Sequence, residues 1–78
     1  MDKIEQQTLN LILQGKNSEL DDFARTHNTM AESIIDNINE KFLAEYNDLL
    51  IENHLDEGPE ILKEYRDEVL WVITFLNV

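Results

Sequence analysis

The segment Ile34–Tyr46, IIDNINEKFLAEY, followed by Asp48–Glu52, DLLIE, decides the fold of this chain. Its apolar residues recur at three- and four-residue steps, which is the spacing of one buried face of an α-helix. We therefore predict that the longest helix covers about residues 30–49 and that the other elements pack around it. The predicted buried stripe consists of Met30, Ile34, Ile35, Ile38, Phe42, Tyr46 and Leu49.

Local motifs predict where this helix and three others begin and end. Thr29-Met30-Ala31-Glu32 matches a capping box at the start of the long helix, which we expect to end between Tyr46 and Leu50. A first helix over Asp2–Gln14 ends at Gly15, because glycine tolerates left-handed backbone. A second helix begins at Ser18, whose hydroxyl can cap free amides, and runs to about residue 26. A last helix begins at Pro59, where a missing amide hydrogen costs nothing, after a loop over residues 51–58.

These segments predict one all-α domain over residues 1–78, with three to four helices around the central helix. The chain has 78 residues, which leaves room for one core only. The expected inward stripe of the last helix is Ile61, Leu62, Tyr65, Val69, Val72 and Leu76. Cysteine is absent, so we expect neither a disulfide nor a thiolate metal site.

The strong acidity of the chain restricts its partners. It carries 17 Asp and Glu against 6 Lys and Arg, a formal net charge of −11. Phosphate backbones repel such a chain, so we expect no direct contact with nucleic acid. The charge fits either simple solvation or a protein partner with a basic face. Because we find neither a secretion signal nor an apolar run of about 20 residues, we expect a cytoplasmic protein without a membrane span.

Catalytic motifs are missing from the sequence, and we expect a protein that is not an enzyme and needs no cofactor. No glycine-rich phosphate loop or metalloprotease helix motif is present. Clustered carboxylates leave a divalent cation open, because calcium and magnesium prefer oxygen ligands. Such clusters are common in an acidic chain, and solvated surface charge is the simpler interpretation of them. The candidate metal ligands are Asp36, Glu40, Asp48, Glu52, Asp56 and Glu57.

The segment Val69–Val78 contains no charged residue, and eight of its ten residues are apolar. Leu70, Trp71 and Phe75 fall off the inward stripe of the predicted last helix, so one helix face cannot bury them all. This end either plugs the core or leaves an apolar patch for a partner, which could be a second copy of the chain. We take these three residues as the candidate interface, with Trp71 as its main anchor.

Asn39 is a polar residue whose position on the predicted long helix indicates a structural role. At about 100° per residue it lies at the edge of the apolar stripe of the long helix. We expect its side chain to bridge backbone groups where the long helix meets another helix.

Several short motifs give residues 20–70 a resemblance to a known family. Phe23-Ala24, Ile38-Asn39-Glu40, the exit Asp48–Glu52, Asp56-Glu57 and Glu64-Tyr65 follow one another along the chain. In this order they resemble the TerB-C domain, which accompanies TerB in bacterial tellurite-resistance and stress-response proteins. The resemblance implies an intracellular, non-catalytic helical domain, with Glu40 and the acidic loop as candidates for metal or partner contact.

We therefore expect a non-catalytic, cytoplasmic protein–protein interaction domain of TerB-C type, with divalent-metal contact through the acidic face left open. Its partner would present a basic or apolar face. The alternative is a small acidic DNA mimic, encoded by a phage or mobile element, that inhibits a nuclease or a DNA-binding protein. Only the second function predicts binding that is lost steeply with salt.

Overall fold

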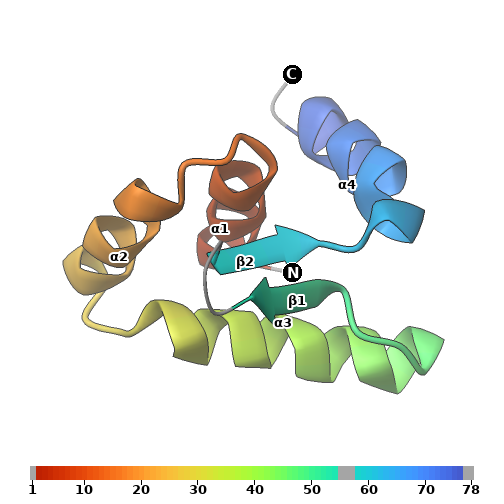
Figure 1. Ribbon diagram of the computed structural model, residues 1–78, viewed down its shortest axis with the longest axis horizontal. Coiled ribbons are helices and arrows are strands. Elements are labelled where there is room, and N and C mark those ends of the chain that lie inside the picture. Colours follow the sequence, from red (N-terminus) through yellow and green to blue (C-terminus); the bar gives the residue numbers. More distant parts are fainter. Residues whose placement is uncertain (1, 55–57, 77–78) are drawn as a thin grey trace.

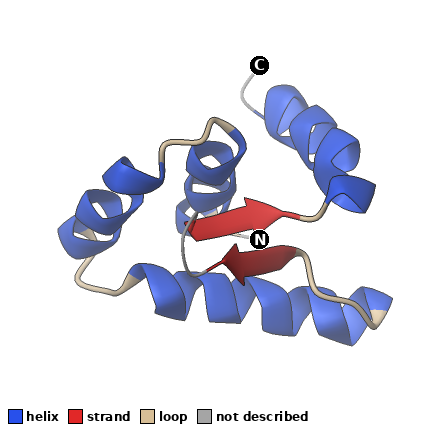
Figure 2. Ribbon diagram, viewed as in Figure 1, coloured by secondary structure: helices blue, strands red, loops and turns tan. Residues whose placement is uncertain are grey.

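A computed structural model describes residues 2–54 and 58–76 of the chain. Within these residues, four helices surround one two-stranded antiparallel sheet (Figures 1 and 2). The small, mostly helical domain predicted from the sequence is thereby confirmed. In chain order the elements are α1 (Lys3–Leu13), α2 (Asn17–Thr26), α3 (Ala31–Tyr46), β1 (Ile51–His54), β2 (Gly58–Ile61) and α4 (Lys63–Leu76).

The β-hairpin corrects the predicted loop over residues 51–58 and the predicted helix start at Pro59. Ile51 pairs with Ile61, and Pro59 pairs with Asn53 inside the ladder. Proline is tolerated there because each strand of a two-stranded sheet is an edge strand. Ile51 and Ile61 are each only 2 % exposed. Burial of this cross-strand pair explains the hairpin, and α4 begins only at Lys63.

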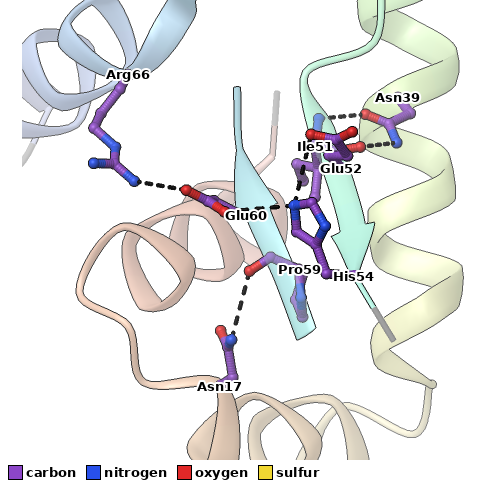
Figure 3. A network of polar contacts seen from close by, with 8 residues as sticks. All are labelled: Asn17, Asn39, Ile51, Glu52, His54, Pro59, Glu60 and Arg66. Carbon is purple, nitrogen blue, oxygen red and sulfur yellow. Dashed lines mark hydrogen bonds and ion pairs between the residues drawn. The ribbon is translucent and has the colours of Figure 1, made fainter. Parts of the chain in front are cut away.

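Gly58 allows β2 to pass close to the first turn of α2. Its φ is +81°, and a Cβ atom there would lie 2.9 Å from Nδ2 of Asn17. The same Nδ2 donates a hydrogen bond to the carbonyl oxygen of Pro59 at 3.5 Å (Figure 3). Only glycine meets both requirements, because other residues rarely adopt positive φ and all carry a Cβ atom.

The side-chain caps predicted for the second and third helices are wrong, and the capping box that the structure does contain was not predicted. Ser18 lies inside α2, and Thr29 precedes the N-cap of α3, so neither α2 nor α3 has a side-chain cap. The capping box is at α1, where the side chains of Asp2 and Glu5 each accept from the other's backbone N–H. The end of α3 is as predicted, with Asn47 in the left-handed conformation.

The core lies where α1, α3, the hairpin and α4 meet. Helix α1 contacts α2, α3, α4 and β2, and in Figure 1 α3 runs beneath the hairpin. Every element contributes buried residues, among them Leu9, Leu20, Ile34, Ile35, Ile38, Leu50, Ile51, Ile61 and Ile73. Four members of the predicted stripes are exposed instead, namely Met30, Tyr46, Leu49 and Val72. The described residues leave these four side chains largely uncovered.

Candidate interaction surface

Asn39 ties α3 to the beginning of β1. Its Oδ1 accepts hydrogen bonds from the backbone N–H groups of Leu50 (3.1 Å) and Ile51 (2.9 Å). Its Nδ2 donates to the carbonyl oxygen of Ile51 at 3.0 Å (Figure 3). The predicted bridge to backbone groups is confirmed, although it joins a helix to a strand rather than two helices. Asn39 thus fixes where the chain leaves α3 and enters the hairpin.

Glu5 is a buried carboxylate that the sequence analysis did not single out. It is 3 % exposed, and its Oε1 lies 2.8 Å from Nζ of Lys41 on α3. The hydrogen bond with Glu5 is the main cause that raises the pKa of Lys41 above its ordinary value, against a smaller opposing effect of desolvation. The Asp2-x-x-Glu5 spacing, a capping box with aspartate as the cap, was the motif that could have indicated a structural role.

Asp48 and Tyr65 link the end of α3 to the start of α4. The hydroxyl of Tyr65 donates to Oδ2 of Asp48 at 2.7 Å. The ring of Tyr65 meets Phe42 edge-on, with centroids 4.9 Å apart, and Phe42 also packs against Tyr46. The hydrogen bond to Asp48, followed by desolvation and the charge of Asp48, raises the pKa of Tyr65 to about 12.

The raised pKa makes the Asp48–Tyr65 link sensitive to alkaline pH. Tyr65 titrates at about 12 in the folded protein against an ordinary value of 10.0, so the link stabilises the fold fully below pH 10 and is lost as the pH rises through 12. In Asp48→Asn we expect the pKa of Tyr65 to fall towards 10. Ultraviolet titration of tyrosinate in a Tyr46→Phe background measures it, and an unchanged curve would contradict the assignment.

An open groove lies between α3 and α4, with α1 at its bottom. Its volume is about 660 Å³, and its floor includes Leu9, Ile38 and Ile73 from the three helices. Tyr46 on α3 and Val72 on α4 also line it, and they are 62 % and 44 % exposed. Neither residue was among the predicted interface residues, because helical periodicity placed both on inward stripes.

The predicted interface residues Leu70 and Trp71 lie at the surface of α4. They are 52 % and 66 % exposed, so neither plugs the core. Trp71 and Val72 line a shallow pocket with Asp67 and Glu68, and the groove also reaches Glu68 and Val72. The side chain of Phe75, the third predicted interface residue, lies outside the described part of the chain. We refer to Leu70, Trp71 and Val72 together as the α4 surface.

Comparison with known proteins assigns the family. A family model described as the TerB-C domain matches residues 1–70. The chain belongs to the TerB-C domain family. The match is longer than the resemblance over residues 20–70 that the motifs indicated, because it includes α1 with its buried Glu5. No curated protein and no solved structure matches the chain.

The candidate metal ligands of this TerB-C domain are dispersed in the part of the chain that the structure describes. Asp36 and Glu40 are exposed on α3, whereas Asp48 accepts a tyrosine hydroxyl. Asp56 and Glu57 lie outside the described residues. Among the residues described, no group of three or more histidine, cysteine or acidic side chains is placed to hold a metal ion. Metal binding by the acidic loop stays a prediction.

A chain of polar side chains crosses the hairpin of the TerB-C domain and reaches α4 (Figure 3). Glu52 and Glu60 lie opposite each other in the ladder, and Nε2 of His54 lies 3.6 Å and 3.5 Å from their carboxylates. Arg66 of α4 approaches Glu60 at 3.3 Å. These groups are largely solvated, so we assign them a modest role in joining the hairpin to α4.

No described helix is long and apolar enough to cross a bilayer.

Proposed function

We propose that this TerB-C domain is a non-catalytic, cytoplasmic protein–protein interaction domain and that the α4 surface contacts its partner. The supporting observation is the exposure of three successive apolar side chains, Leu70, Trp71 and Val72, at 52 %, 66 % and 44 %. Tryptophan combines a large apolar area with a polar N–H group, and it is enriched among the residues that dominate binding energy at protein interfaces.

The surroundings of the α4 surface also support a protein partner. Asp67 and Glu68 border Trp71 and Val72 in the shallow pocket. An apolar centre with a charged border is the common arrangement of a protein interface, in which the border stays solvated while the centre is buried. Glu5 bonds to a lysine, Asn39 to the backbone and Asp48 to a tyrosine, so these three side chains have contacts within the fold.

Capture from a lysate of the organism that encodes the protein tests this proposal. The full chain is immobilised and compared with Trp71→Ser and with Met30→Ser, a control whose side chain is equally exposed at 65 % but lies at the start of α3. We expect a protein that survives a high-salt wash, that is retained by Met30→Ser, and whose capture falls at least about tenfold in Trp71→Ser. Circular dichroism should show equal helix content in all three proteins.

Two results would contradict the proposal. One is capture that Trp71→Ser and Met30→Ser retain equally well. The other is capture of nucleases or DNA-binding proteins that disappears in high salt and is indifferent to Trp71, because screening by salt is the mark of a charge-driven DNA mimic.

A further inference from the structure

The groove between α3 and α4 is the part of the surface that points to a specific kind of partner. We infer that it receives an amphipathic helix of another protein, with apolar residues in the groove and lysine or arginine on the flanks of the helix. The inference rests on the proposed interaction function and adds to it the position of the site and the chemistry of the partner segment.

The groove continues two helix faces that the described residues leave partly uncovered. The stripe of α3 is buried at Ile38, half-buried at Phe42 and exposed at Tyr46. On α4, Ile73 is buried and Val69 is half-buried, whereas Val72 is 44 % exposed. The exposed members of both stripes, Tyr46 and Val72, line the same groove. Helical periodicity marks these residues for burial, so an additional apolar helix would complete the packing that the chain begins.

Helix α1 gives the groove its shape. It contacts both α3 and α4 and supplies Leu9 to the floor. A helix that lies on such a floor presents residues i, i+3 or i+4, and i+7 to it, which is the usual mode of helix-in-groove recognition.

The charged residues that line the groove indicate the sign of the charge that a partner should carry. Glu45 on α3 and Glu68 on α4 line opposite walls, and neither forms an ion pair with any described residue. Among the described residues that line the groove, the only cation is Lys41, which is bonded to the buried Glu5. The charge available to a partner is therefore negative on both sides, which fits basic residues on both flanks of a bound helix.

The same charge argues against a second copy of this chain as the occupant. Each copy carries a formal net charge of −11, and like charges brought together at an interface are repelled. A basic segment is instead attracted over a distance, which speeds its association at low ionic strength.

Selection from a display library of helical peptides, about five turns long and randomised on one face and both flanks, tests the inference. The immobilised target is the full chain. We expect the enriched peptides to combine apolar residues at i, i+3 or i+4, and i+7 with a net positive charge. One enriched peptide is then synthesised, and its dissociation constant is measured against variants of the chain by fluorescence anisotropy.

Matched variants locate the site. Val72→Asp should weaken peptide binding at least about tenfold, because it places a charge at an apolar contact. Leu43→Asp is the control, since Leu43 is 47 % exposed on α3 but does not line the groove. The double change Glu45→Gln/Glu68→Gln should weaken binding about fivefold and flatten its salt dependence. This pair of exposed side chains also provides the test if Val72→Asp does not fold.

The outcomes separate this inference from the proposed function. Enrichment of neutral or acidic peptides, no enrichment at all, or binding that Val72→Asp and the glutamate pair leave unchanged would overturn the inference. If lysate capture still depends on Trp71 in that case, the interaction function stands and only the groove and its basic helix are wrong. If Trp71-dependent capture is absent too, both proposals fail.

Discussion

Replacing Asn39 by leucine is expected to lower the free energy of unfolding by about 4 kcal/mol. Leucine has nearly the shape of asparagine but offers no hydrogen bond. The N–H groups of Leu50 and Ile51 and the carbonyl of Ile51 would each lose the bond that Asn39 makes with it. Leu50 and Ile51 are 1 % and 2 % exposed, so water cannot readily take the place of the lost side chain as their hydrogen-bond partner. Each buried group left unpaired costs about 1–3 kcal/mol.

Urea unfolding measures this loss, and Asn37→Leu is its matched control. Asn37 is exposed on the same helix, two residues away, and we expect its replacement to change the free energy of unfolding by no more than about 0.5 kcal/mol. A domain of this size has a small stability in total, so Asn39→Leu should be largely unfolded under mild conditions. Equal stability of the two variants would show that the bridge contributes little.

Replacing Glu5 by alanine is expected to lower the free energy of unfolding by about 3 kcal/mol. The change removes the capping-box carboxylate that accepts from the backbone of Asp2, the hydrogen-bonded ion pair with Lys41, and the packing of a side chain that is almost fully buried. The pair holds α1 against α3, so its loss should also loosen the floor of the groove.

Glu19→Ala is the control for this prediction, because Glu19 occupies the same position in the first turn of α2 and also approaches a lysine. Its contact with Lys16 is long, 3.9 Å, and both side chains are more than half exposed. Exposed pairs of this kind contribute little, so thermal unfolding should show a large loss only for Glu5→Ala. A similar loss in both variants would indicate a helix-capping effect without a contribution from burial.

The fold was predictable where one local pattern decided the structure. The stripe of α3 specified the long helix, and its end at Tyr46, with Asn47 as the C-cap, falls within the range expected from the sequence. Asn39 was predictable as a bridge because a polar residue at the edge of a buried stripe has few other roles. In each case the deciding residues lie within a few positions of one another, so no knowledge of the tertiary structure was needed.

The hairpin and the Glu5–Lys41 pair were not predictable in this way. Strands β1 and β2 have four residues each, and the pair Ile51 and Ile61 is buried at one end, so no alternating pattern is visible. Pro59 followed by an acidic residue is a common helix start, and tertiary burial overrides it here. Glu5 and Lys41 are 36 positions apart, and only the packing of α1 on α3 brings them together.

The candidate site was predictable in part for the same reason. Leu70 and Trp71 fall off the stripe of α4, which left open whether they plug the core or form an exposed patch, and the structure places both at the surface. Tyr46 and Val72 obey the helical period and were expected to be inward. Their exposure depends on which elements pack over them in the tertiary structure, which periodicity does not encode.

The central claim is that this domain binds another protein through the groove and the α4 surface. Photocrosslinking in living cells tests this claim most directly. Benzoylphenylalanine is introduced in place of Val72 and, in a second protein, in place of Leu43, two positions of nearly equal exposure at 44 % and 47 %. The account predicts a crosslinked protein partner from position 72 and none from position 43. Crosslinks that are equal at both positions, or absent at position 72, would contradict it.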